Sequence, residues 1–159
     1  MFESLVSFIA SFPAPLASFL LGATPISEIR GAIIFAFQQG NLFLILYGIL
    51  GNMFAGLCLL AFWNLLKIQD IGLMIVGKRI SKMIERYHRN HELGETIALA
   101  LFIGVPLPVT GVYSGVLLAK VLKISNKKIA VASVCGILMA SIIMYLALSG
   151  AVSFLNVFT

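Results

Sequence analysis

The sequence predicts an all-α membrane protein with two inverted repeats. Each repeat is expected to contain a proline-broken re-entrant helical hairpin followed by one transmembrane helix, with an amphipathic interfacial helix joining the repeats. The 159 residues are 60% hydrophobic and have a mean hydropathy of +1.06, too apolar for a domain whose surface faces water. Two long apolar segments are interrupted by proline, and most basic residues lie in two linkers.

Four apolar stretches are visible, at about 13–39, 42–66, 95–119 and 129–158. Each exceeds or matches the roughly 20 residues that cross a bilayer as a helix. The second and fourth contain neither charge nor proline, which predicts two transmembrane helices. We expect a single integral membrane domain over 1–159, divided into a first repeat (1–66), a cytoplasmic amphipathic linker (67–92) and an inverted second repeat (93–159).

The basic residues indicate how these stretches are oriented. Six lie between Lys67 and Arg89 and four between Lys120 and Lys128. If all four stretches crossed, these two groups would face opposite sides, which the positive-inside bias disfavours. We therefore expect 95–119 to enter and leave on the cytoplasmic side. By symmetry the first stretch is also a hairpin, and both termini are expected on the outer side of the cell membrane.

Basic residues confined to two linkers do not form a face that could follow nucleic acid, so no nucleic-acid partner is expected. Apolar and basic positions recur at three- and four-residue spacing within the linker 67–92. This pattern predicts a helix lying on the anionic inner leaflet, with membrane lipids as its partner.

The first hairpin has clear signals at its break. Gly22 can end one helical arm, and Thr24 followed by Pro25 is a good N-cap and first helical position for the next. That second arm is expected to run to about Gln39, where Gly40 can end it.

The second hairpin repeats this plan. Gly104 can end its first arm, and the prolines Pro106 and Pro108 prevent a continuous helix. The next arm is expected to begin near Pro108 and to run to about Leu122. Both second arms would then span about 15 residues of this sequence, and their N-termini would meet near the middle of the membrane.

Two meeting helix N-termini favour an anion, because each presents unpaired N–H groups and about half a positive charge. Arg30 adds a full positive charge, hydroxyl side chains add hydrogen-bonding groups, and two glycines allow close backbone approach. The predicted substrate-binding residues are Thr24, Pro25, Ser27, Arg30, Gly31, Pro106, Pro108, Thr110 and Gly111.

Glu28 is the predicted proton-coupling residue. The helix dipole favours its carboxylate and desolvation favours the neutral acid, so the two effects oppose each other. Glu28 and Arg30 are two residues apart and point to different faces of a helix. Each is therefore expected to find a partner in the other hairpin, in a substrate or in a second subunit. In the alternative interpretation the first hairpin is shallow, and both residues lie near the membrane–water interface, which the long side chain of Arg30 reaches by snorkelling.

The motifs Ser27-Glu28-Ile29-Arg30-Gly31-Ala32 and Pro106-Leu107-Pro108-Val109-Thr110-Gly111 resemble the two signatures of the small multidrug export protein family. The resemblance extends over nearly the whole chain and implies drug efflux. The plan of hairpin plus crossing is also similar to the wider DedA-like group of membrane proteins. That similarity implies proton-coupled transport or flipping of polyprenyl-phosphate lipids.

These observations lead to three hypotheses. The first is a small secondary transporter or exporter, a proton-coupled homodimer that moves an anionic or amphipathic substrate between the hairpin tips. The second is a flippase for polyprenyl phosphate or another lipid phosphate, and the third is a non-transporting structural membrane protein. The chain has no visible nucleophile–base pair, metal-ligand set or phosphate-cradling loop, so we expect no enzyme, no metal and no cofactor.

The predicted topology can be tested by labelling single cysteines introduced at Gly40 and at Asn126, after replacing Cys58 and Cys135. A membrane-impermeant maleimide added to intact cells should label the Gly40 position only. The Asn126 position should react only after the membrane is opened. Labelling of both positions from outside would contradict the re-entrant second hairpin.

Overall fold

The computed structural model describes residues 8–9, 11–63, 92–106 and 110–157. These ranges hold six helices and no strand: α2 (Ala14–Ala23), α3 (Glu28–Gln38), α4 (Leu44–Ala61), α6 (Glu92–Gly104), α7 (Val112–Val121) and α8 (Asn126–Val157). The prediction of an all-helical chain is therefore confirmed for this part. The interfacial helix expected in the linker 67–92 falls almost entirely outside the described residues.

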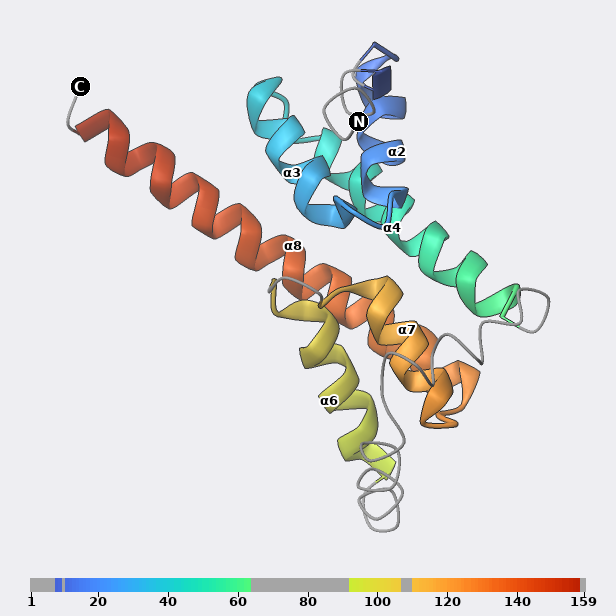
Figure 1. Cartoon of the computed structure of the whole chain (residues 1–159). Helices are drawn as coiled ribbons and strands as arrows, with labels where there is room; N and C mark the ends of the chain where they lie inside the picture. Colours follow the sequence, from blue (N-terminus) through green and yellow to red (C-terminus); the bar gives the residue numbers. More distant parts are fainter. Residues whose placement is uncertain (1–7, 10, 64–91, 107–109, 158–159) are drawn as a thin grey trace.

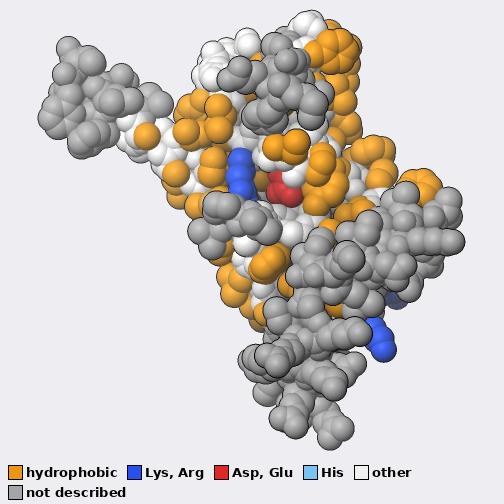
Figure 2. Space-filling view, viewed as in Figure 1, with side chains coloured by type: hydrophobic (Ala, Val, Ile, Leu, Met, Phe, Trp, Pro, Cys, Tyr) orange, Lys and Arg blue, Asp and Glu red, His pale blue; other side chains and the backbone are white. Residues whose placement is uncertain are grey.

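Two of these helices are long and apolar enough to cross a membrane. They are α4 and the Asn126–Ala151 part of α8, and they match the two stretches without proline. Large apolar side chains remain exposed along them, including Leu46, Phe54 and Ile142, and Figure 2 shows how widely hydrophobic side chains cover one face. A patch of this extent is unusual on a soluble monomer and is expected of a surface that faces lipid.

The first break lies where it was predicted, but α3 begins later than expected. The backbone turns extended at Thr24, and α3 starts at Glu28 after an N-cap at Ser27. The prediction that Thr24 is the N-cap and Pro25 the first helical residue is therefore wrong. The cause is local, because the hydroxyl of Thr24 bonds backward to the Leu21 carbonyl instead of forward to the next helix.

The second break shows the same delay. Helix α6 ends at Gly104, as predicted, but α7 begins at Val112 rather than near Pro108, which lies outside the described residues. Gly111 precedes it with φ 154°, a backbone conformation that cannot continue a helix. The second arms therefore have 11 and 10 residues, shorter than the expected 15.

The two halves of the chain use the same order of elements and pack across each other. In each half a short helix lies along the long one, α2 on α4 and α6 on α8. The second short helix contacts the long helix of the other half as well, so α3 packs on α8 and α7 packs on α4. In Figure 1 the α2–α3 break and the α6–α7 break approach each other in the middle of the molecule.

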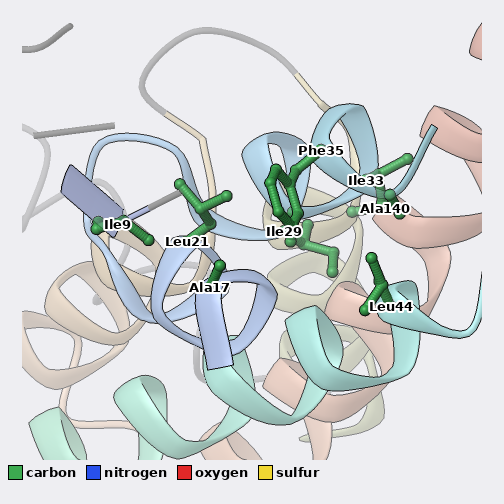
Figure 3. Close-up of a cluster of buried hydrophobic side chains, with 10 residues drawn as sticks. Ile9, Ala17, Leu21, Ile29, Ile33, Phe35, Leu44 and Ala140 are labelled. Carbon is green, nitrogen blue, oxygen red and sulfur yellow. The ribbon is translucent and has the colours of Figure 1, made fainter. Parts of the chain in front are cut away.

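Each half has its own hydrophobic core with a contribution from the other. The first core gathers buried residues of α2, α3 and α4 around Ile29 and Ile33, and Ala140 of α8 completes it. Figure 3 shows Ala140 next to Ile33 and across from Leu44. The second core gathers α6, α7 and α8, with Met53 and Leu60 of α4 packed against it. Neither half therefore buries its core without the other.

Contacts near the helix ends fix which termini lie together. The Nζ atom of Lys120, at the end of α7, lies 5.9 Å from the ring centre of Trp63, which follows α4. Lys128 in the first turn of α8 pairs with Glu95 in α6 at 3.4 Å. At the other end of the molecule Phe37 of α3 packs on Tyr145 of α8, with 5.7 Å between ring centres.

Glycines bring the short and long helices into backbone contact. A Cβ on Gly22 of α2 would overlap the carbonyl of Gly48 in α4, and one on Gly51 would overlap the carbonyl of Phe19. In the second half, a Cβ on Gly104 would lie against Met139 and the Gly136 carbonyl. Small residues that let backbones approach are the usual means of packing helices in membranes.

This close packing predicts the effect of adding one methyl group. Gly51→Ala should destabilise the protein by about 1–3 kcal/mol, because the helices must separate to relieve the overlap. Gly150→Ala is the matched control, since a Cβ there meets nothing within 4 Å, and its effect should be neutral or slightly stabilising. Thermal unfolding of the purified protein in detergent measures both. Equal melting temperatures for the two variants would contradict the close α2–α4 contact.

Candidate functional site

A cavity of about 250 Å³ lies where the two breaks meet. Its walls come from the loop and first turn after α2 and from the start of α7. Polar and charged groups are concentrated in this lining, although the helices around it are almost wholly apolar. The lining residues are Pro25, Ile26, Ser27, Glu28, Arg30, Thr110, Tyr113, Ser114 and Leu117.

Side-chain hydroxyls close the first break. Thr24 and Ser27 both donate to the Leu21 carbonyl, at 2.9 and 2.7 Å, or share a hydrogen bond with each other. Gly31 makes room for this arrangement, because a Cβ there would overlap the Ser27 side chain. These two hydroxyls, expected to bind substrate, therefore satisfy a carbonyl that the end of α2 leaves exposed.

The second break is closed in a similar way. The Thr110 hydroxyl donates to the Val105 carbonyl at 2.6 Å, one residue beyond the end of α6. Thr110 thus satisfies a backbone carbonyl just past the end of α6, as Thr24 satisfies one in the last turn of α2. In a medium without water such internal partners are needed for every exposed backbone group.

The two hairpins also bond to each other across the cavity. The Arg30 guanidinium donates to the Thr110 carbonyl. In the opposite direction the Tyr113 hydroxyl donates to the carbonyl of Ala23, the last residue of α2. Each hairpin therefore supplies a side chain that satisfies a backbone oxygen at the break of the other.

The Glu28 carboxylate occupies the N-terminus of α7. It accepts hydrogen bonds from the backbone N–H groups of Tyr113 and Val112, and the missing Cβ of Gly111 leaves the space in which the carboxylate lies. Glu28 is 8% exposed as a residue, and it lies in the wall of the cavity. A negative group at a helix N-terminus is stabilised by the unpaired N–H groups and by the helix dipole.

Glu28 holds this position in a strained backbone conformation. Its φ is 49°, and of the described residues other than glycine only Lys123 shares a positive value. A left-handed conformation costs a residue with a Cβ about 1–2 kcal/mol. The contacts of its carboxylate with α7 compensate for this cost, which links the backbone of the first break to the second hairpin.

The partners of the charged residues answer one question that the sequence left open. Within the described residues Glu28 and Arg30 form no salt bridge with each other, as their spacing predicted. Both instead bond to the second hairpin, Arg30 at Thr110 and Glu28 at the start of α7.

The predicted site residues fall into three groups. Pro25, Ser27, Glu28, Arg30 and Thr110 line the cavity. Thr24, Gly31 and Gly111 lie directly behind the lining and shape it, whereas Pro106 is half-buried outside it and Pro108 is outside the described residues. Sequence reasoning missed Ile26, Tyr113, Ser114 and Leu117. Tyr113 could have been found, because it stands two residues after Gly111 in a first turn equivalent to that of Glu28.

No group of three or more His, Cys, Asp or Glu side chains that could hold a metal ion is present in the described part of the chain. The charged groups that the cavity does contain can hold an anion or a cation through Arg30 or Glu28, and Glu28 can exchange a proton.

Comparison with known proteins gives one match. The model of a family described as "Putative small multi-drug export protein" matches residues 28–143, so it begins at Glu28 and includes both sides of the cavity. Comparisons with curated proteins and with solved structures gave no significant match.

The contact of Gly111 with Glu28 predicts a coupled effect on stability. Gly111→Ala should destabilise the protein by about 2–4 kcal/mol, because the new Cβ overlaps the carboxylate and φ 154° is unfavourable for alanine. Gly40→Ala is the control for backbone strain alone, since φ is +62° there and nothing lies within 4 Å; it should cost about 1 kcal/mol.

A double-mutant cycle separates the two contributions. In a Glu28→Ala background the overlap is gone, so Gly111→Ala should cost less than in the wild type. Melting temperatures of the four proteins in detergent give the coupling. Strict additivity would show that Glu28 and Gly111 do not contact each other.

Proposed function

The chain belongs to the family of putative small multi-drug export proteins, and from this membership and the cavity we propose that it is a small secondary transporter. In this proposal the substrate is anionic or amphipathic and binds between the hairpin tips. Glu28 exchanges a proton, and Arg30 attracts the negative group. The protein acts without chemical conversion of its substrate, as a transporter rather than an enzyme.

One observation carries the proposal. Two oppositely charged side chains lie in a cavity of about 250 Å³ inside an otherwise apolar helical protein. Placing ionisable groups at such a position is costly, and in membrane proteins they mark transport paths and proton relays. Neutral hydroxyls can satisfy backbone oxygens at both breaks, as those of Thr24, Thr110 and Tyr113 do, so closing a break does not by itself require an ionisable side chain.

Contacts at the helix ends support a re-entrant arrangement. The end of α7 lies beside the end of α4 through Lys120 and Trp63, and the starts of α6 and α8 lie together through Glu95 and Lys128. An α6–α7 hairpin that enters and leaves on the cytoplasmic side requires these neighbours. The proposal therefore keeps both basic linkers inside, both termini outside and an inverted relation between the halves. Two crossings and two hairpins offer little material to enclose a substrate pathway, and a second subunit in a homodimer would supply the missing walls.

A lipid-phosphate flippase is the second candidate function. The cavity is not sealed, because Pro25 and Ile26 at its edge are exposed, Ile26 by 69%. Figure 2 shows acidic and basic atoms near the middle of the view, with hydrophobic side chains on either side of them. A phosphate headgroup could bind there while its apolar chain stays in the bilayer. Polyprenyl phosphates have this chemistry.

Proteoliposomes with an imposed pH gradient test transport. Octanesulfonate and octyltrimethylammonium are suitable probes, since both are amphipathic and keep their charge at any working pH. The protein should carry the sulfonate faster than protein-free liposomes do. Glu28→Gln should reduce the gradient-driven flux by at least roughly tenfold, within the usual range of coupling free energies, and Arg30→Glu should abolish it.

Glu95→Gln is the control, because Glu95 is a carboxylate that pairs with Lys128 far from the cavity. It should retain the flux. Full coupled transport by Glu28→Gln would exclude the proton role of Glu28. Flux of neither probe would count against transport of amphipathic ions.

A further inference from the structure

The cavity holds an anion already, and that anion is part of the chain. The N-terminus of the second arm, where the structure places the N–H groups of Val112 and Tyr113, was expected to receive a substrate anion. In the structure these N–H groups donate to the carboxylate of Glu28. The carboxylate fills the space left by Gly111, and Glu28 as a whole residue is 8% exposed. A substrate anion that uses the same donors must therefore displace it.

We propose that Glu28 is a tethered competitor for the substrate anion, and that protonation of Glu28 releases the α7 N-terminus so that the anion can bind. This inference rests on the proposed function, since it places the substrate in the same cavity. It specifies how proton binding is coupled to anion binding, which the proposed function leaves open. One proton and one negative charge are bound together, so they move in the same direction across the membrane.

The geometry favours release on protonation. An ionised carboxylate accepts from two N–H groups and gains from the dipole of α7, whereas a neutral acid loses most of that gain. The left-handed backbone of Glu28, with φ 49°, is maintained by those contacts. Arg30 stays in place through its bond to the Thr110 carbonyl. After release, Arg30 and the two N–H groups would face the same space.

The neutral acid also needs a hydrogen-bond acceptor, and Asn52 offers one. Its Oδ1 atom is buried and has no partner, with the residue 1% exposed. Asn52 lies one helical turn from Gly48 and one from Gly56, on a face of α4 where these glycines contact Ile29 and Val112. Ile29 is next to Glu28 in the chain, and Val112 is one of the two residues whose N–H groups donate to the Glu28 carboxylate. Asn52 therefore lies on the face of α4 that packs on both hairpins, and in this proposal it accepts the proton of the released Glu28 side chain.

Other titratable groups near Glu28 are few in the described part of the chain. Arg30 is on its own helix, Tyr113 is on α7, and Cys58 of α4 lies near Tyr113. Helix α2 has no titratable side chain. Tyr145 of α8 contacts α3 only at its far end, at Phe37. A proton taken up with the anion is accordingly assigned to Glu28.

Binding of octanesulfonate to the protein in nanodiscs tests the proposal without requiring transport. Because the probe keeps its charge, any pH dependence comes from the protein. The wild-type affinity should rise by about tenfold for each unit that the pH falls over the titration of Glu28. Calorimetry in buffers of different ionisation enthalpy should detect one proton taken up per bound anion. Glu28→Gln should bind the probe at every pH as tightly as the wild type does at low pH, without proton uptake.

Three further variants make the outcome specific. Glu95→Gln should keep the wild-type pH dependence, Arg30→Gln should weaken binding at every pH, and Asn52→Leu should move the pH midpoint downward. Weaker binding by Glu28→Gln than by the wild type at low pH would overturn the proposal, and so would a wild-type affinity independent of pH. If binding behaves as expected but liposomes show no flux, the competition stands and the transport function fails. If only octyltrimethylammonium is bound and carried, transport stands and the competition fails.

Discussion

The need to satisfy backbone groups where a helix breaks in an apolar medium governs this structure. Each break leaves carbonyl and N–H groups without helical partners, and neither water nor lipid can replace them in the interior. Local hydroxyls satisfy part of this need, at Thr24 and at Thr110. The remainder is satisfied across the molecule, by Arg30, Tyr113 and the Glu28 carboxylate. The meeting of the two breaks is thus a requirement of the backbone, and the cavity lies where they meet.

The cross-packing of the long helices follows from the same requirement. For the breaks to meet, α3 must reach α8 and α7 must reach α4, and both contacts are present. Backbone-to-backbone approach at Gly22 and Gly51 holds α2 close against α4. These small residues therefore position the helix that leads into the first break. Charge in the cavity is tolerated because every charged group has a partner on the opposite hairpin.

The sequence was sufficient for the all-helical architecture, and five of the residues that it singled out line the cavity. Hydropathy and proline positions predict the order of helices and both breaks, because each signal is local. The predicted start of α3 was wrong by three residues, because the Thr24 hydroxyl bonds backward to Leu21. The predicted start of α7 was wrong by about four residues, because Gly111 has a non-helical backbone against which the Glu28 carboxylate packs. Similarly, Tyr113 and Asn52 look like ordinary residues of apolar helices. Their relation to the breaks depends on contacts between residues far apart in the chain, which periodicity does not report.

The distance along the chain between bonding partners has a consequence for biosynthesis. Arg30 and Thr110 are separated by 80 residues, and Tyr113 and Ala23 by 90. At roughly 5–20 residues per second, the ribosome reaches the second partner about 4–18 seconds after the first hairpin has been made. During that interval the Glu28 carboxylate, the Arg30 guanidinium and the Ala23 carbonyl have no native partner. Until the second hairpin arrives, these groups must be satisfied by water, by lipid headgroups or by another protein.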